Sequence, residues 1–152
     1  MGERRTIGAG SEIEVGAPAT PLPESVELAL RDVVQHRSDI AFACVPVIAF
    51  PEQPPSEVLV VFLRRGVPPE EVLGPLADEV QRAVAVAMET APSARIVELA
   101  VLPISLGYPL DGLAQAVIQS DTVLLVADQA AWHVAKRPSR PLWQRILWPW
   151  GR

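Results

Sequence analysis

Two apolar stretches decide the fold that this sequence predicts: IAFACVPVIAF at residues 40–50 and VLVVFL at residues 58–63. Large and small side chains alternate along most of the first stretch, which is the period of a β-strand. One face carries Ile40, Phe42, Cys44, Ile48 and Phe50, and the other carries Ala41, Ala43, Val45, Val47 and Ala49. This pattern predicts a strand with a helix packed closely against its small face. The second stretch is apolar throughout, which is typical of a strand buried on both faces. The short proline-rich link at 51–56 predicts an antiparallel pair.

Proline residues indicate where elements begin and where they are interrupted. Pro46 cannot donate a hydrogen bond to a neighbouring strand, so we expect the strand at 40–50 to lie at a sheet edge or to carry a bulge there. Pro23 precedes an apolar stripe at helical spacing, and the pair at 68–69 precedes another; proline suits the first turn of a helix. We expect the second and longer of these helices to kink or restart at Gly-Pro, residues 74–75.

The predicted order of elements over residues 23–128 is α-β-β-α-β-α-β. Its second half holds a strand at 96–102, a helix at 109–119 and a strand at 122–127, each an apolar run between turn signals. A strand, a helix and a further strand in succession form a parallel pair joined by a right-handed crossover. We therefore predict a single α/β domain whose mixed four-stranded sheet is packed by helices. Because the strands are apolar on both faces, helices or a second copy of the chain, as in a homodimer, should cover both.

Both ends of the chain differ in composition from this predicted domain. Residues 1–22 mix glycine, proline and charged residues with no period, so we predict a flexible arm. Residues 129–152 hold five basic residues and no acidic one, net +5, whereas residues 1–128 hold 18 acidic and 8 basic residues, net −10. All four tryptophans also lie in this basic tail. An acidic body repels phosphate groups, so we predict no nucleic-acid partner.

Several kinds of chemistry lack the residues that they need. Cys44 is the only cysteine, so no intrachain disulfide can form, and its apolar neighbours predict a small buried hydrophobe. One cysteine and two distant histidines predict no metal site, and no glycine motif predicts a phosphate-bearing cofactor. Ser105, Asp128 and His133 make a triad on paper only, because a triad is defined by geometry that spacing does not supply. We therefore expect no catalytic residue, no cofactor and no enzyme activity.

Signals that would direct the chain to a membrane or out of the cell are weak. No apolar run reaches the ~18 residues of a membrane span. The first residues lack the apolar core of a secretory signal. We therefore expect a cytoplasmic protein.

One loop could hold a small ligand. Residues 104–109 follow a predicted strand and precede a predicted helix. Ligands of open α/β sheets bind beyond the carboxyl ends of strands. Ser105 and Tyr108 are therefore the candidate ligand-binding residues, and a plain connecting loop is the alternative.

The basic tail holds the candidate contacts to another surface. Residues 142–148 have the apolar spacing of about two helical turns. The candidate contacts to a partner or a membrane are Trp143, Arg145, Ile146, Leu147, Trp148 and Trp150. Tryptophan and arginine anchor protein interfaces, and they also suit peripheral contact with a membrane. Fold-back of the tail onto the acidic body and simple disorder are the remaining alternatives.

Several segments resemble the C-terminal domain of the enhanced serine sensitivity protein (SseB) family. They are ESVELALRDVV (24–34), DIAFACVPVIAF (39–50), VLVVFLRRGVPPEEVLGPLADEVQRAV (58–84), VELAVLP (97–103), PLDGLAQAV (109–117) and TVLLVA (122–127). The resemblance covers about residues 23–128 and consists of apolar patterns and turns. It implies an α/β domain with no established catalytic residues and a loose link to amino-acid metabolism. The additional N-terminal domain common in that family has no counterpart in this sequence, and the tryptophan-rich tail is added.

Three functions follow as hypotheses. The leading one is a non-catalytic protein-interaction or regulatory module with an unidentified protein partner, because catalytic chemistry is missing and the strands are apolar on both faces. The second is a sensor of amino acids or other small molecules that uses the loop at 104–109. The third is an enzyme of unrecognised type.

Overall fold

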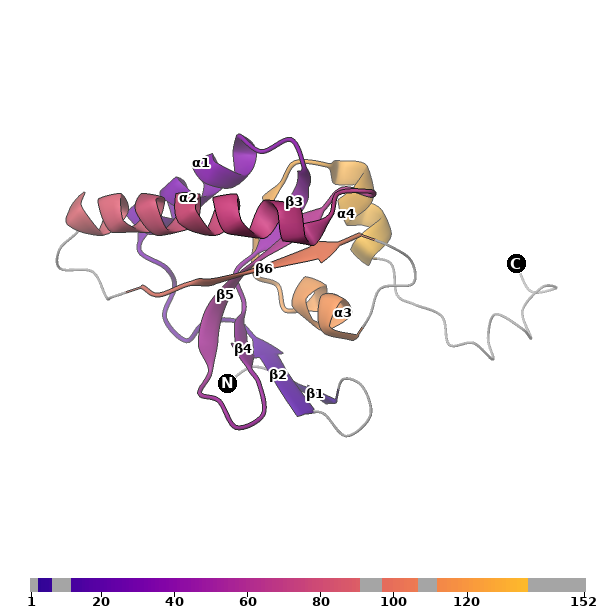
Figure 1. Ribbon diagram of the computed structural model, residues 1–152. Helices are drawn as coiled ribbons and strands as arrows, with labels where there is room; N and C mark the ends of the chain where they lie inside the picture. Colours follow the sequence, from indigo (N-terminus) through magenta and orange to yellow (C-terminus); the bar gives the residue numbers. More distant parts are fainter. Residues whose placement is uncertain (1–2, 7–11, 91–96, 107–111, 137–152) are drawn as a thin grey trace, which may run out of the picture.

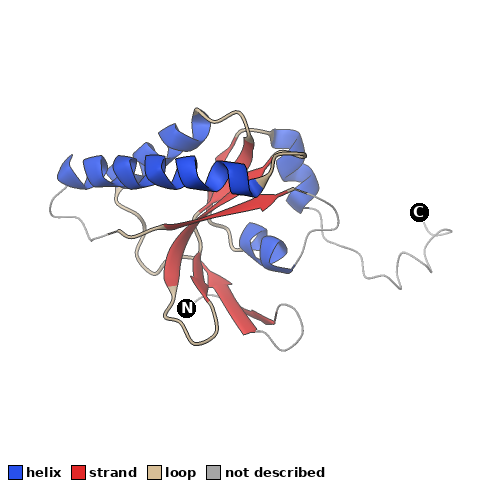
Figure 2. Cartoon of the chain, in the orientation of Figure 1, coloured by secondary structure: helices blue, strands red, loops and turns tan. Residues whose placement is uncertain are grey.

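A seven-stranded sheet and four helices make up the part of the chain that the structure describes (Figures 1 and 2). The structure is a computed structural model, and it describes residues 3–6, 12–90, 97–106 and 112–136. The strands are β1 (Glu3–Thr6), β2 (Glu12–Gly16), β3 (Ile40–Cys44), β4 (Val47–Ala49), β5 (Ser56–Leu63), β6 (Ala100–Ser105) and β7 (Val123–Val126). The helices are α1 (Glu24–Gln35), α2 (Pro69–Thr90), α3 (Gly112–Gln119) and α4 (Gln129–Lys136). The prediction of a single mixed α/β domain is confirmed.

Strand β5 is the centre of the sheet. It pairs antiparallel with β3 along one edge and parallel with β6 along the other. Strand β7 pairs antiparallel with β3, so β5, β6 and β7 all run in one direction. The predicted antiparallel pair joined by residues 51–56 and the predicted parallel pair across α2 are both confirmed. The parallel pair predicted across α3 is wrong, because β7 pairs antiparallel with β3 and not with β6. The carboxyl ends of β5, β6 and β7 therefore lie at the same edge of the sheet.

The prediction of a flexible arm at residues 1–22 is wrong for the described strands in that range, because β1 and β2 form an antiparallel pair. Strand β2 also pairs with β4, placing Val15 opposite Ile48, and Val15 is only 2% exposed. The sequence EIEVG alternates polar and apolar residues with the period of a strand, but the surrounding glycine and proline obscure so short a pattern. The sheet therefore has seven strands among the described residues, in place of the predicted four.

The predicted strand at 40–50 is divided in two at Pro46. Strand β3 ends at Cys44 and β4 begins at Val47. The carbonyl of Pro46 still accepts a hydrogen bond from the amide of Val58, at 3.0 Å. We expected either an edge position or a bulge at Pro46. The structure shows a full break between two strands, and β3 lies between β5 and β7 and not at an edge. Proline is tolerated because it stands in the break, where no ladder bond is lost.

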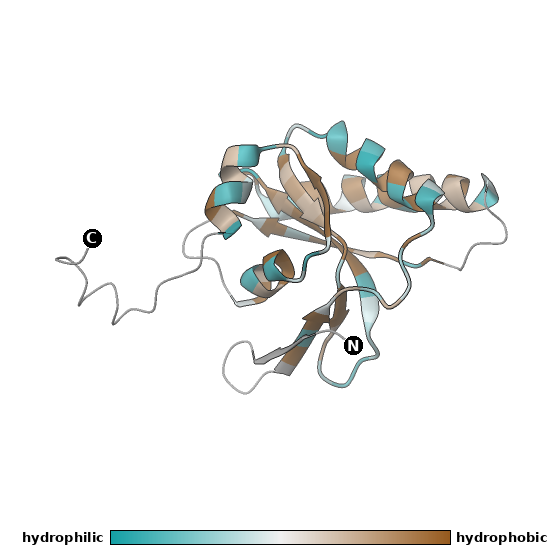
Figure 3. Cartoon of the chain, turned by 180° about the vertical axis from the view of Figure 1, so that it is seen from behind, coloured by the Kyte–Doolittle hydropathy of each residue, from teal (hydrophilic) through white to brown (hydrophobic). Residues whose placement is uncertain are grey.

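Helices cover both faces of the sheet, as expected for strands that are apolar on both sides (Figures 1 and 3). One core lies between the sheet and α1 with α2, and the other lies between the sheet and α3 with α4. Alternate residues of β5 belong to the two cores. The first core contains Leu59, Val61 and Leu63, and the second contains Val58, Val60 and Phe62. A register shift after Ile40 turns Ile40 into the first core and Phe42 into the second. The helices on the small face of β3 are thus α1 and α2.

Helix α2 is a single helix from Pro69 to Thr90 with Pro75 inside it, so of the predicted kink or restart at 74–75 the restart is wrong. Gly74 and Pro75 are both exposed. The missing hydrogen bond would have been accepted by the carbonyl of Glu71, which is also an exposed residue, so water can replace the bond. None of the helices within the described ranges combines the length and apolar character needed to cross a lipid bilayer.

Strand β6 is displaced from its predicted position at 96–102. It begins at Ala100 and continues through Pro103 to Ser105. The predicted strand stopped at residue 102, before Pro103, but among the described residues β6 pairs with β5 alone. An edge strand tolerates proline, because a missing N–H on the open side costs no ladder bond. Residues 109–111, where the third helix was predicted to begin, lie outside the described residues, and α3 is described from Gly112.

Helix α4 was not predicted, and it moves the boundary of the domain beyond residue 128. The carboxylate of Asp128 accepts a hydrogen bond from the amide of Ala131 at 3.0 Å, which caps the helix. Ala135 is buried, and the ring of Trp132 lies edge-on to Phe42 with 4.9 Å between the centroids. Residues 129–136 thus belong to the domain, and the remainder of the predicted tail, residues 137–152, lies outside the described residues.

Candidate functional site: the groove between α1 and α2

Helices α1 and α2 lie side by side and antiparallel above the sheet (Figure 1). Near the start of α1, the hydroxyl of Ser25 donates to the carbonyl of Ala87 at 3.4 Å. Just past its end, the guanidinium of Arg37 donates to the carboxylate of Glu79 at 2.9 Å. These two contacts fix the relative direction of the helices, because residue numbers rise along α1 as they fall along α2.

An open groove of about 550 Å³ runs between the two helices. Its lining consists of Ser25, Ala29, Asp32, Val33, Glu79, Arg82, Ala83, Val86, Ala87 and Thr90. Half of these ten residues are alanine or valine, and Val86 on one wall is 61% exposed. On α1, Leu28 is 58% exposed and lies three or four residues from Ser25 and Asp32, which places it beside the groove. The two helices thus form a solvent-exposed apolar groove with a polar rim.

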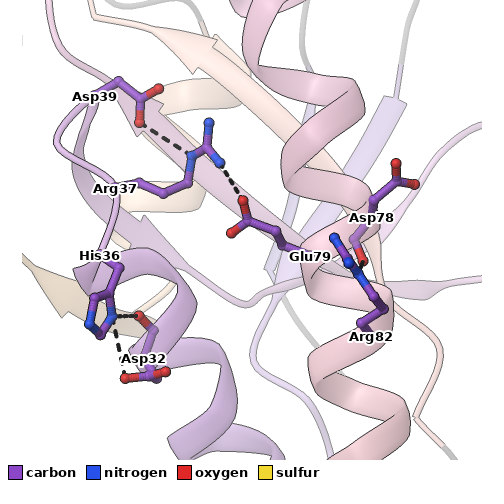
Figure 4. A network of polar contacts seen from close by, with 7 residues as sticks. All are labelled: Asp32, His36, Arg37, Asp39, Asp78, Glu79 and Arg82. Carbon is purple, nitrogen blue, oxygen red and sulfur yellow. Dashed lines mark hydrogen bonds and ion pairs between the residues drawn. The ribbon is translucent and has the colours of Figure 1, made fainter.

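Charged side chains order one end of the groove (Figure 4). Arg37 is mostly buried and joins Asp39, at 3.5 Å, to Glu79, at 2.9 Å. The exposed carboxylate of Asp32 lies 3.4 Å from His36. Arg82 donates from Nε to the carbonyl of Asp78 within its own helix. Arg37 therefore fixes the position of Glu79, while Asp32 on the other wall remains accessible to a ligand.

The helix layer that forms the groove is strongly acidic. Together α1 and α2 contain eight acidic and two basic residues, net −6. Helices α3 and α4 on the other face contain no acidic residue and one lysine. Much of the negative charge of the body therefore lies on the two helices that form the groove, and Asp32 and Glu79 line it. A field of this sign attracts cationic ligands.

Of the two residues predicted for a ligand loop, the structure describes Ser105 alone. Ser105 is exposed at the end of β6, and its hydroxyl donates to the carbonyl of Val67 at 3.0 Å. This bond ties β6 to the turn after β5, in which Gly66 has φ +85°. Tyr108 lies outside the described residues. The tail candidates Trp143, Arg145, Ile146, Leu147, Trp148 and Trp150 also lie outside them.

Asp128 and Arg64 form a structural link at the carboxyl edge of the sheet. Arg64 donates from Nη1 to Asp128 at 2.9 Å and from Nε to the carbonyl of Ser38 at 2.8 Å. Asp128 also caps α4 through its second oxygen. Both its oxygens and the hydroxyl of Ser105 thus have structural partners.

Cys44 has the surroundings of a core residue. Its side chain is inaccessible to water, and desolvation by burial raises the pKa of the thiol from 9.0 to about 12. The thiol therefore stays protonated near neutral pH, and the thiolate is the reactive form. Within the described ranges, no three histidine, cysteine, aspartate or glutamate residues lie close enough together to hold a metal ion.

No protein family, curated protein or solved structure matches the chain. The groove between α1 and α2 was not predicted from the sequence. Its available signal was weak: Leu28 and Val86 are apolar residues on the outward sides of helices whose apolar stripes face inward. Single exposed apolar residues are common on protein surfaces. These two residues indicate a groove only once the two helices are known to lie side by side and antiparallel.

Proposed function

We propose that this chain is a non-catalytic protein-interaction module whose docking surface is the groove between α1 and α2. The observation that carries the proposal is the combination of an open apolar trough, an exposed Val86 and a net charge of −6 on the surrounding helices. A peptide with apolar anchors and flanking basic residues suits such a surface. Its anchors would bury apolar area, and its cations would meet the acidic rim.

The open shape of the groove favours a short peptide segment over a small metabolite. The groove is open along its length, whereas small-molecule sites enclose most of the ligand surface. An apolar groove between helices is a known binding site for an amphipathic helix. The bound helix inserts its own side chains, at every third or fourth position, into the groove. The predicted role as a regulatory module and the resemblance to the enhanced serine sensitivity family stay proposals. The same holds for a sensor that uses Ser105 and Tyr108.

Site-specific photocrosslinking tests where a partner binds. A photoreactive amino acid is placed in the full chain at Val86, in the groove, and separately at Gln119, an exposed position on α3. We expect a partner protein to be captured in cells from position 86 and not from position 119. Mass spectrometry of the adduct should locate the captured segment, which we expect to be basic and to carry apolar anchors. Capture at position 119 alone would overturn the assignment of the groove.

A charge substitution gives a quantitative test of the same surface. Val86→Lys removes an apolar contact and adds repulsion toward a basic peptide. We expect this substitution to raise the dissociation constant of the captured partner about tenfold, which corresponds to about 1.4 kcal/mol of binding free energy. Val134→Lys is the matched control, because Val134 is also an exposed valine on a helix, on the other face of the sheet. Titration calorimetry with the purified partner measures both, and equal affinities for the two variants would contradict the proposal.

A further inference from the structure

We infer that the groove between α1 and α2 accepts the basic C-terminal segment of the same molecule, residues 137–152. The inference rests on the proposed function, because it assigns an occupant to the same groove. Any external partner would then have to displace this segment. The assignment of this segment to the groove has two grounds. The composition of the segment matches the groove, and the chain is long enough to reach it.

The charges of the two surfaces are complementary. Residues 137–152 contain four arginines and no acidic residue, net +4. The α1 and α2 layer carries net −6, whereas α3 and α4 have no acidic residue. A basic segment near this body is therefore drawn to the α1 and α2 face rather than to the opposite one.

The apolar residues of the segment match the groove. The segment holds Trp143, Trp148 and Trp150, together with Ile146 and Leu147. A flat indole ring needs a trough with small side chains, and Ala29, Ala83 and Ala87 line this one. Arginines beside the rings would face the rim, where Asp32 is exposed. Tryptophan and arginine together are frequent anchors of protein interfaces.

The chain is long enough to bring the segment to the groove. Helix α4 lies on the opposite face of the sheet, but a series of contacts connects its start to one end of the groove. Arg64 joins Asp128 to Ser38, and Ser38 adjoins the Arg37 that binds Glu79. A chain that leaves the end of α4 must first run back along the eight residues of that helix, which is about 12 Å. To follow the groove along all twelve residues of α1 it needs about 18 Å more. The 16 residues after Lys136 can span up to roughly 53 Å when extended. The segment is therefore long enough to reach the groove of its own molecule.

Photocrosslinking within the purified full chain tests the inference. With the photoreactive residue at Val86, we expect a cross-link to residues 137–152 that is intramolecular and independent of protein concentration. The control position Gln119 should give none. The yield should fall severalfold when salt rises from 0.1 to 1 M, since the Debye length shortens from about 10 to about 3 Å.

Paired variants of the segment separate its charges from its rings. Arg140→Glu with Arg145→Glu should remove most of the cross-link by reversing two charges, and Trp143→Ser with Trp148→Ser should do so by removing the anchors. Ser139→Ala with Gln144→Ala is the matched control, which changes the same segment without either feature, and it should keep the yield unchanged.

Each contrary outcome has its own meaning. A cross-link between two molecules that grows with concentration identifies a second copy as the occupant and overturns the inference. Tryptophan emission that shifts to the blue only on addition of anionic phosphatidylserine vesicles, with no cross-link at Val86, assigns the segment to a lipid surface and also overturns it. Capture of a partner at Val86 without any cross-link to 137–152 leaves the proposed function standing alone. Loss of both signals removes the proposed function as well.

Discussion

At the scale of single residues, Asp128 has two separable roles. One oxygen caps α4 through the amide of Ala131, and the other pairs with Arg64. Asp128→Ala should lower the free energy of unfolding by about 1–2 kcal/mol, because it removes both the cap and the partly exposed ion pair. Asp128→Asn should cost less, since asparagine caps helices equally well. Urea denaturation measures both variants, and equal losses would show that the cap contributes nothing.

Cys44 predicts a specific dependence of stability on pH. Burial raises the pKa of its thiol to about 12 in the folded chain, against 9.0 when exposed. Above pH 9 the unfolded chain loses this proton while the folded chain keeps it, so stability falls as pH rises. The slope approaches about 1.4 kcal/mol per pH unit and ends near the folded pKa.

The comparison that isolates this effect is between the natural chain and Cys44→Ala. Urea titrations at several pH values from 8 to 11 give the free energy of unfolding of each. The variant should lack this part of the alkaline slope, because it has no thiol to ionise on unfolding. Parallel curves for the two chains would contradict the assigned burial of the thiol.

At the scale of elements, the hairpin of β1 and β2 has a testable role in stability. Val15 on β2 is buried against the second core, although the surrounding composition is that of a flexible segment. Val15→Ala should lower the free energy of unfolding by about 1–2.5 kcal/mol, through lost burial and the cavity that remains. Ala19→Gly, at an exposed position in the following loop, should cost much less. Equal stabilities in urea denaturation would restore the original prediction of a mobile arm.

The elements show which parts of a fold a single sequence can predict. Long periodic segments such as α1, α2 and β5 were predicted because burial imposes a repeating pattern on many residues. The exceptions involve prolines and short elements. Pro75 lies in a helix and Pro103 in a strand because each stands on an exposed or unpaired side, and exposure is a property of the assembled sheet. Helix α4 escaped prediction because its eight residues gain their place mainly by tertiary packing on Phe42.

At the scale of the whole molecule, the candidate site depends on relations that no local pattern contains. The groove exists because α1 and α2, which are separated in sequence by β3, β4 and β5, lie antiparallel on the same face of the sheet. The charge of each helix could be read from the sequence. That the two acidic helices border the same groove can be known only from the topology of the fold.

The two cores should unfold together, because β5 supplies alternate residues to each of them. Leu59 lies in the first core and is fully buried, so Leu59→Ala should cost about 2–5 kcal/mol. Trp132 reports on the second core through its contact with Phe42. Replacing Trp143, Trp148 and Trp150 by phenylalanine leaves Trp132 as the single fluorescent probe. In that background, Leu59→Ala should shift the fluorescence transition and the far-ultraviolet dichroism transition to the same lower urea concentration, as a single cooperative unit requires. A fluorescence transition that stays in place while the dichroism transition moves would show that the two helix layers unfold independently across the shared strand.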